Sequence, residues 1–474
     1  MPMYYNLEPK KWDKAERVLE KKRIANNLIR LRKALRTHLR LQRKKENRDE
    51  SLDSEMFIRL ATWNIRELGA NRKYGKRLDE SLFYISEILS HFDLIAVQEV
   101  NEDLYDLNRI TSILGKGSWD YIATDATEGR SGNGERMAFV FNKNKVSFKD
   151  IAGEVVLPDY LKVNAPFNER LCFEKNLNLR LPNGTSLKSP SDVGTYRRQG
   201  KEYLSEELAV DLPENTWLKL PKGAKIVFPR RTIVEKTNGG NISLPKGSEI
   251  NFSNNTMINL PDEYIASYAL QFARTPFLVS FQSAWLKLNL CTVHIYYGQG
   301  KEGLYRRNQE ITKLTEFLAT RAENEMRYDP NSFFVALGDF NIVGRDHVTM
   351  KSLISNGFKL PKKLKEIPSG SNVAKTMYYD QIAYWTDQSK EAKHKKVYTN
   401  FEVTAAGIFD FFNTVFRYDP ENPNGGDEGT YQEHLKPKWE FKDWRTYQMS
   451  DHLPMWVELR TDFGDEYLHY ISKD

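Results

Sequence analysis

The sequence predicts an α/β fold in which β-sheets pack face to face and helices cover them on the outside. Short apolar runs alternate with helical stretches along most of the chain, and the strand-like runs outnumber the helical ones. The length of 474 residues is enough for one large α/β domain with attachments. A hydrophobic content of 40% with 28% charged residues is ordinary for a globular protein.

The alternation of strand-like and helix-like runs begins at residue 57. Helices are predicted at 80–92 and 306–325. The predicted strands are FIRLATWNI (57–65), DLIAVQEV (93–100), ERMAFVFNK (135–143), PFLVSFQ (276–282), LKLNLCTVHIYY (286–297), NSFFVALGDF (331–340) and DHLPMWVEL (451–459). Because helices fall between strands, sheets with helices outside them are the arrangement that fits.

Residues 157–262 interrupt this alternation. A degenerate unit recurs there, as LPNGTSL at 181, LPENTWL at 212, LPKGAKI at 220 and LPKGSEI at 244. Its Pro-x-Gly or Pro-x-Asn turns separate short β-prone runs, which predicts a β-rich insertion. The predicted domains are therefore an arm and linker (1–56), a main domain (57–156 and 263–474) and the insertion (157–262).

The net charge of +6 conceals a basic N-terminal segment. Residues 9–48 contain 16 Lys or Arg and four acidic residues, so this segment carries +12 and the rest of the chain −6. From Lys10 to Glu46 there is no Gly or Pro, and apolar residues recur every three or four positions, which predicts an amphipathic helix. These positions are Ile24, Leu28, Leu31, Leu35 and Leu39. Residues 47–56 are polar and acidic and are predicted to form a linker.

Three interpretations of the basic helix remain open. It is an arm that binds nucleic acid, a helix docked on the body or on a second copy of the chain, or a helix on an anionic membrane surface. For the first interpretation, the candidate contact residues are Lys21, Lys22, Arg23 and Arg36. The sequence leaves the oligomeric state open.

Several classes of protein are excluded or disfavoured. No window approaches the roughly 18 apolar residues that a membrane span requires. The first residues lack the basic-then-apolar order of a secretory signal, so we expect a cytoplasmic location. Cys172 and Cys291 have no CxxC partner, which disfavours a disulfide framework or a zinc site.

Six short segments place polar residues where apolar runs stop: TWNIR (62–66), QEV (98–100), TVHIYY (292–297), GDFN (338–341), YYDQI (378–382) and SDHLP (450–454). Taken singly, each is more typical of a turn, a cap or a buried polar residue. Together they predict one cluster at an edge of the sheets, where catalytic groups gather in α/β folds. Its candidate members are Asn64, Glu99, His294, Asp339, Asn341, Asp380, Asp451 and His452.

This cluster suits hydrolysis of a phosphodiester. Glu99 with an Asn or Asp neighbour offers the oxygen ligands that Mg²⁺ prefers, and Mn²⁺ or Ca²⁺ are alternatives. Asp380 with His452 matches a base that is positioned by a carboxylate. Asn341, His294 and an arginine could donate to the phosphate oxygens.

The ordered set WNIR, QEV, a strand-ending His, GDFN, YDxI and SDHLP resembles the endonuclease/exonuclease/phosphatase superfamily over residues 57–460, interrupted by the insertion. The resemblance implies a four-layered α/β sandwich with the site at one edge of two sheets. Arg66 after TWNI and His294 in TVHI are most similar to the deoxyribonuclease I branch. ARTPF resembles one of that branch's strands, although Thr275 stands where the family has Glu.

The resemblance also implies roles for the candidate residues. Glu99 would be the metal ligand, with Asn64 beside it and Asp451 contributing. Asp339 and Asn341 would act around the phosphate, Asp380 and His452 would form the acid/base pair, and His294 would be a second catalytic histidine. Arg66 and Arg274 would contact phosphate.

We expect a Mg²⁺-dependent nuclease that hydrolyses the DNA or RNA backbone, with the basic segment adding affinity for the polymer. A lipid or inositol phosphoester hydrolase of the same superfamily is the first alternative, and the PxWCDR signature of the inositol 5-phosphatases is absent. An inactive binding scaffold is the second alternative, and it conflicts with the filled site positions.

Overall fold

The computed structural model describes residues 2–44, 56–69, 73–126, 134–158, 161, 271–329, 331–385, 401–422 and 425–472, together with the backbone of short strands between 170 and 251. The chain forms two compact units. The first consists of Met1–Val156, Phe272–Tyr297 and Glu310–Asp474, and the second of Leu157–Gln271 and Gly298–Gln309. The linker predicted at 47–56 lies, except for Met56, outside the described residues.

The first sheet of the first unit has, in the described part of the chain, six strands in the order β22-β23-β1-β2-β4-β3. β1 pairs with β2 in parallel and with β23 antiparallel. The bounds are β1 Phe57–Leu68, β2 Leu94–Asn101, β3 Trp119–Ala123, β4 Glu135–Asn142, β22 Val403–Ile408 and β23 Met455–Arg460.

The second sheet has the described strand order β20-β21-β19-β18-β17-β5. β18 pairs with β19 in parallel, and β19 pairs with β21 antiparallel. The bounds are β5 Ser147–Glu154, β17 Phe277–Ser283, β18 Leu286–His294, β19 Ser332–Asp339, β20 Phe358–Lys359 and β21 Asp380–Trp385.

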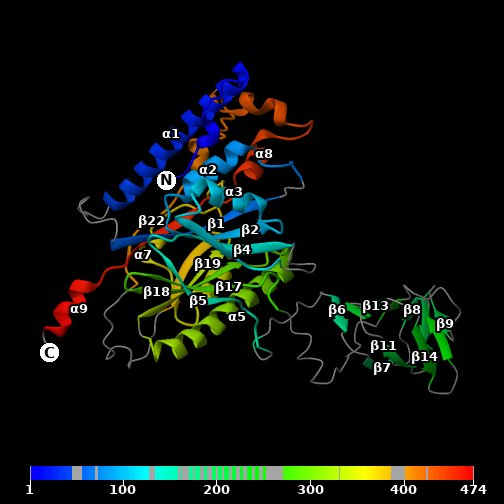
Figure 1. Ribbon diagram of the computed structural model, residues 1–474. Helices are drawn as coiled ribbons and strands as arrows, with labels where there is room; N and C mark the ends of the chain where they lie inside the picture. The colour runs from blue at the N-terminus through cyan, green and yellow to red at the C-terminus, as the bar shows by residue number, and fades with distance from the viewer. Residues whose placement is uncertain are drawn as a thin grey trace. The chain divides into compact units, whose positions relative to one another are not determined.

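Helices cover the outer faces of both sheets (Figure 1). α1, α2, α3 and α8 lie over the first sheet, and α5 lies under the second. The helix bounds are α1 Ala15–Lys44, α2 Asp79–Leu89, α3 Tyr105–Leu114, α5 Gly300–Met326, α6 Val348–Leu353, α7 Lys362–Lys365, α8 Phe441–Gln448 and α9 Gly464–Ile471, with 3-10 turns at Tyr5–Leu7, Phe411–Asn413 and Glu428–His434. Helices, sheet, sheet and helix make four layers, which confirms the predicted α/β sandwich.

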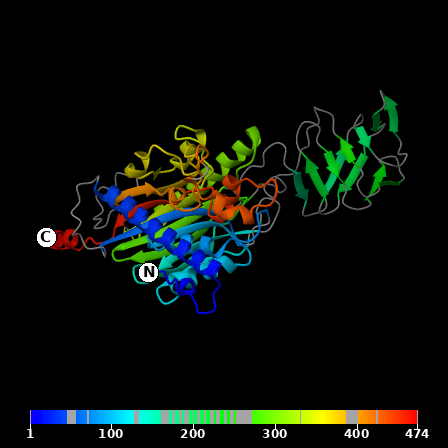
Figure 2. The ribbon, with the colours of Figure 1, turned by 90° about the horizontal axis from the view of Figure 1, so that it is seen from above.

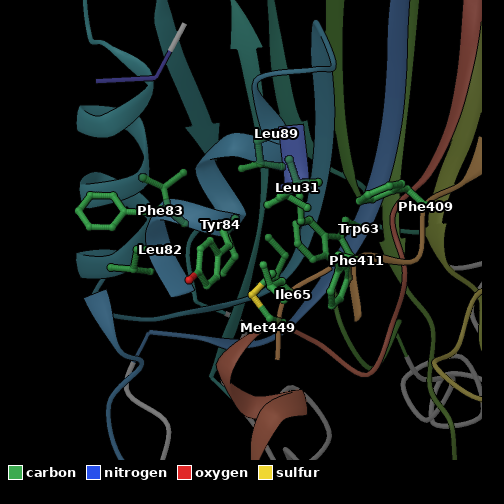
Figure 3. Packing of buried hydrophobic residues seen from close by; sticks show 14 of the residues in the cluster. Leu31, Trp63, Ile65, Leu82, Phe83, Tyr84, Leu89, Phe409, Phe411 and Met449 are labelled. Carbon is green, nitrogen blue, oxygen red and sulfur yellow. The ribbon is translucent and has the colours of Figure 1, made fainter. Parts of the chain in front are cut away.

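Two buried clusters follow from the side-chain period of two in a strand. On β1, Ile58 and Leu60 point into the cluster between the two sheets. Ala61, Trp63 and Ile65 of the same strand lie in the cluster beneath the helices. Figure 3 shows that second cluster, in which side chains from α1, α2 and β1 pack together.

Between the two sheets, the inward side chains change from apolar to polar along the strands. After Ile58 and Leu60, the next inward positions on β1 are Thr62 and Asn64. Gln98 of β2 donates from Nε2 to Oγ1 of Thr62 at 3.1 Å and to Oγ1 of Thr292 on β18 at 2.8 Å. These fully buried residues form a polar belt between the sheets, and the apolar core ends there.

The basic segment forms α1, which lies across the first sheet (Figure 2). Its five periodic apolar residues, from Ile24 to Leu39, are all buried in the helix-side cluster. Arg23 pairs with Glu80 at 2.8 Å, and Arg32 pairs with Glu87 at 2.7 Å. Nε of Arg43 lies 2.9 Å from Oε2 of Glu458. α1 is therefore docked on the body of its own chain.

This docking corrects two of the four predicted contact residues of the arm. Lys21 is buried and pairs with Asp13 at 2.7 Å, and Arg23 is committed to Glu80. Lys22 and Arg36 are exposed. A period of 3.6 residues puts positions 21 and 22 on different sides of a helix, so adjacent lysines have different surroundings. In the described part of the chain, no helix is both long enough and apolar enough to cross a bilayer.

The second unit contains two antiparallel sheets in its described strands, ordered β6-β12-β13-β16-β8-β10-β9 and β15-β14-β11-β7. The turns of the LPxG-type repeat lie outside the described residues. The strand bounds are β6 Arg170–Phe173, β7 Leu177–Leu181, β8 Ser186–Lys188, β9 Thr195–Arg198, β10 Lys201–Leu204, β11 Leu208–Leu212, β12 Thr216–Lys219, β13 Lys225–Val227, β14 Thr232–Lys236, β15 Asn241–Leu244 and β16 Glu249–Asn251.

Candidate active site

The predicted polar residues meet at one edge of the two sheets, beyond the polar belt. Asn64, Glu99, His294 and Asp339 lie on or near the last residues of β1, β2, β18 and β19, as expected. The prediction that every segment ends a strand was wrong for two of them. Asp380 is the first residue of β21, and His452 precedes β23. Both of these strands run antiparallel to their neighbours, so their beginnings lie at the edge where the other strands end.

Asp339 is the centre of the cluster. Its Oδ2 lies 3.0 Å from Nδ2 of Asn64, on the opposite sheet. The same oxygen lies 3.6 Å from Nε2 of His294 and 3.7 Å from Nε2 of His452. The backbone N–H of Asn341 donates to Oδ1 at 2.8 Å. One buried carboxylate thus faces two imidazoles and one carboxamide.

Each of the two histidines is held by a second carboxylate. Nδ1 of His452 lies 2.8 Å from Oδ2 of Asp380, as the sequence predicted. Nδ1 of His294 lies 2.8 Å from Oε2 of Glu135, a residue that the sequence motifs do not single out. Glu135 is the first residue of the ERMAFVFN strand. A charged side chain at the start of an apolar strand is the sequence signal that could have identified it. Both rings therefore direct Nε2 toward Asp339.

Glu99 lies within β2 at an irregularity of the strand pairing, beside Asn64. Its φ is +58°, in the left-handed region, and the register between β2 and β4 shifts between Val97 and Val100. Oε1 of Glu99 accepts from Nδ2 of Asn64 at 2.9 Å, and Oε2 accepts from the backbone N–H of Glu67 at 3.1 Å. The second of these bonds fixes the Glu99 carboxylate to the end of β1.

The GDFN turn owes its shape to two residues. Gly338 has φ +134°, and a Cβ there would lie 2.2 Å from the carbonyl oxygen of Val293, so only glycine fits. Asn341 has φ +52°, and its Nδ2 donates to the carbonyl oxygen of Ile295 at 2.7 Å. This close approach of the two chain segments sets His294 and Asp339 side by side.

The two predicted phosphate-binding arginines lie at the pocket but are already paired. Nε of Arg274 lies 2.7 Å from Oε2 of Glu135, the carboxylate that also holds His294. Arg66 pairs with Asp451 at 3.2 Å and lies over the Tyr447 ring, 3.8 Å from its centroid. Asp451 is 41% exposed, so it borders the pocket instead of lying beneath it.

A cavity of about 750 Å³ opens over this cluster. Of the described residues that line it, seven of sixteen are acidic and four are Arg or His. Asn64 and Asp380 lie behind the lining and hold residues within it. The lining residues are Arg66, Glu67, Glu99, Asn101, Glu102, Asp103, Gly134, Glu135, Arg274, His294, Tyr297, Asp339, Asn341, Tyr379, Asp451 and His452.

The buried charges shift one another's protonation. Burial lowers the pKa of His452, but Asp380 and Asp339 outweigh burial and raise this pKa well above its usual value. Burial and Arg274 lower the pKa of His294, and Glu135 and Asp339 outweigh them and raise it. Burial raises the pKa of Asp339, but His452 and His294 outweigh burial and lower it. The cluster therefore favours two imidazolium rings around an ionised Asp339.

The oxygen atoms around Glu99 fit a hard divalent cation. Burial raises the pKa of Glu99, more than His294 lowers it, so an added positive charge would stabilise the ionised form. Asn64 turns Nδ2 toward Glu99 and Asp339, and its buried Oδ1 has no hydrogen-bond partner in the described structure, so exchanging the two ends of this amide would place the oxygen beside Glu99. No group of three or more His, Cys, Asp or Glu side chains among the described residues is arranged to hold a metal. One carboxylate and one amide oxygen still suffice for Mg²⁺, which keeps waters and substrate oxygens as its other ligands.

Comparisons with known proteins identify similar chains. The model of the Endonuclease/Exonuclease/phosphatase family matches residues 61–424. No curated protein matches the chain. Solved structures of similar fold include humanized D. rerio TDP2 with 14 mutations, at 9% identity, covering 85% of this chain and 98% of that chain with a TM-score of 0.39. The human Nocturnin catalytic domain with bound sulfate has 14% identity, coverage of 86% and 95%, and a TM-score of 0.34. The mannosyl-6-phosphatase of Bacteroides thetaiotaomicron VPI-5482 has 13% identity, coverage of 85% and 99%, and a TM-score of 0.33.

Proposed function

Because the chain belongs to the Endonuclease/Exonuclease/phosphatase family, whose enzymes act on phosphoester bonds, we propose that it is a divalent-metal-dependent phosphodiesterase that cuts the backbone of nucleic acid. One observation carries the proposal. Two imidazoles, each anchored by its own carboxylate, face the same oxygen of Asp339 at 3.6 and 3.7 Å on the floor of an open pocket.

The protonation of the cluster supports a division of roles in hydrolysis. A water molecule attacks phosphorus, and the ionised Asp339 accepts its proton. The bond to the leaving oxygen breaks, and that oxygen takes a proton from the His452 imidazolium. His294, also protonated, donates a hydrogen bond to a non-bridging phosphate oxygen. The proton on Asp339 then restores His452, so that the site returns to its starting state.

The charge of the pocket supports the need for a cation. Acidic residues outnumber Arg and His in the lining, and Arg66 and Arg274 are each paired with a carboxylate. An anionic substrate would be repelled unless positive charge is added. A divalent cation held by Glu99 and Asn64 would supply that charge and polarise the phosphate oxygens.

The same pairing of arginines supports a diester substrate over a monoester. A phosphodiester carries one negative charge, whereas a phosphomonoester carries up to two near neutral pH and needs more positive charge in its site. Tyr297, which is 48% exposed, and Tyr379, stacked on the His452 ring at 5.4 Å, line the pocket. Aromatic rings beside a phosphate site can stack on bases, which supports a nucleic-acid substrate.

The test is cleavage by the full chain of plasmid DNA, single-stranded DNA and RNA, next to choline-phosphate and phosphoinositide substrates, with Mg²⁺ or with EDTA. We expect cutting of nucleic acid that needs the metal and is lost in His452→Ala. Asp427→Asn, which breaks an ion pair with Arg417, is the matched control and should retain activity. Activity confined to the lipid or inositol substrates would overturn the choice of substrate, and activity on none of them would overturn the enzyme proposal.

A further inference from the structure

Two sets of cations on α1 differ in what neutralises them. On the inner side, the body supplies buried carboxylates: Glu80 for Arg23, Glu87 for Arg32 and Glu458 for Arg43. On the outer side, Lys22, Lys33, Arg36 and Arg40 are exposed. None of these four forms an ion pair with a carboxylate of the described structure. The inner set is used for docking the helix, and the outer set is available to a partner.

The outer cations share one face of the helix with exposed apolar residues. Leu19, Lys22, Asn26, Ile29, Lys33, Arg36 and Arg40 recur at steps of three or four, so they form one stripe, opposite the buried apolar stripe. Leu19 and Ile29 in this stripe are each 66% exposed. Trp12, just before the helix, is 78% exposed, and Lys10 lies 5.4 Å from its ring centroid. We call the seven residues from Leu19 to Arg40, together with Trp12, the outer stripe.

The outer stripe has no acidic residue over most of its length. The acidic residues of α1, Glu16 and Glu20, lie before Lys21, and residues 21–45 contain no Asp or Glu, so no acidic residue within that part of the helix offsets the outer cations. The partner must therefore be anionic. It must also accept apolar side chains, because Ile29 lies between Lys22 and Lys33 on the stripe and Leu19 lies one turn before Lys22.

We propose that the outer stripe docks the protein on the surface of an anionic lipid bilayer. The cations would meet the headgroups, and Trp12, Leu19 and Ile29 would enter the interface between headgroups and acyl chains. A nucleic-acid backbone offers phosphates for the cations, but it offers no apolar phase for the aliphatic side chains. The mixture of the two kinds of side chain thus favours lipid over nucleic acid. α1 would lie flat on the surface, because its other face is already packed on the first sheet (Figure 2).

The test is sedimentation of the full chain with vesicles of phosphatidylserine and phosphatidylcholine, compared with vesicles of phosphatidylcholine alone. We expect binding to the anionic vesicles that weakens with salt. Lys22→Gln, Lys33→Gln, Arg36→Gln and Arg40→Gln together should weaken binding at least a hundredfold, since each cation near such a surface contributes about fivefold. The matched control removes four exposed lysines elsewhere, Lys116, Lys351, Lys359 and Lys438, and should bind as the wild type does.

A second variant separates lipid from nucleic acid. Leu19→Gln with Ile29→Gln keeps every charge and removes only exposed apolar side chains, so it leaves the packed face intact. We expect it to weaken vesicle binding clearly and to leave retention on duplex DNA unchanged. If the four-cation variant loses DNA binding while binding vesicles normally, the outer stripe is a nucleic-acid surface and the proposal is wrong. No binding of the wild type to anionic vesicles would also overturn it, whatever the activity of the site in the pocket.

Discussion

Asp380 and His452 lie 72 residues apart in the sequence, yet Nδ1 of the histidine is 2.8 Å from Oδ2 of the aspartate. Asp380 is fully buried, so its charge acts on the ring without screening by water. The contact fixes the ring so that Nε2 faces Asp339 at 3.7 Å. The orientation of the acid in the proposed reaction thus depends on a residue that does not itself line the pocket.

Asp380→Asn tests this relationship. The substitution keeps the shape and removes the charge that raises the pKa of His452, so less of the imidazolium form remains. We expect kcat to fall at least about a hundredfold with a smaller change in KM. The alkaline limb of the profile of kcat against pH should move to lower pH, because His452 would lose its proton earlier. Steady-state cleavage rates from pH 5 to 9 measure both, and an unmoved alkaline limb would exclude His452 as the acid.

Glu135→Gln tests the second carboxylate–imidazole pair. Removing the charge that raises the pKa of His294 should lower that pKa and reduce kcat about tenfold to a hundredfold. NMR titration of the histidine ring protons reports the pKa directly. Glu102→Gln is the control, because Glu102 lines the same pocket without contacting either ring. A normal cleavage rate in Glu135→Gln would mean that the positive charge of His294 plays no part in catalysis.

Glu99→Gln tests the proposed cation site. The amide has the size of the carboxylate but no charge, so we expect the Mg²⁺ concentration for half-maximal activity to rise about tenfold or more. His452→Asn should lower the rate while leaving that concentration nearly unchanged, because it acts on proton transfer. Cleavage measured across a Mg²⁺ series separates the two effects. The same Mg²⁺ dependence in wild type and Glu99→Gln would place the cation elsewhere.

Glu87→Gln tests how α1 is held and gives a dependence of stability on pH. Burial raises the pKa of Glu87, but Arg32 and Tyr4 outweigh burial and lower it in the folded protein. A carboxyl with a depressed pKa stabilises the fold above its unfolded pKa, about 4.3, and loses that contribution as pH falls through its folded pKa. We expect Glu87→Gln to reduce the free energy of unfolding by about 2 kcal/mol at pH 7.

The difference between the two proteins should shrink as the pH falls below the unfolded pKa of about 4.3 toward the lowered pKa of folded Glu87. Urea unfolding at pH 7, 5 and 3.5 measures it. Asp120→Asn, which changes a half-exposed carboxylate 3.8 Å from Lys143, is the control and should alter stability little. A difference in the free energy of unfolding that stays constant at every pH would mean that the charge of Glu87 does not stabilise the fold.

Much of the fold and site was predictable, because the relevant signals are local. The apolar runs that became β1, β2, β18 and β19 end in polar residues, and parallel strands bring such ends together. The direction of β21 and β23 was not predictable from the same runs. A run of apolar residues has the same composition whichever way it pairs, so the positions of Asp380 and His452 at strand beginnings required the tertiary structure.

Glu135 and the inner cations of α1 were missed for a related reason. Glu135 contacts His294, which is 159 residues away, only because β4 and β18 face each other between the sheets. Lys21 and Lys22 look equivalent in the sequence. They differ in burial because the rest of the protein packs on only one side of α1. Periodicity identified the buried stripe correctly, but the carboxylates that pair with the inner cations lie as far as 415 residues along the chain.

That last separation has a consequence for biosynthesis. Glu458, which pairs with Arg43, lies on β23, the strand that completes the hydrogen bonding of β1. During translation at roughly 5 to 20 residues per second, β23 follows α1 by roughly 20 to 80 s. Until β23 is made, the nascent β1 has at least one open edge, and α1 lacks one of its anchors.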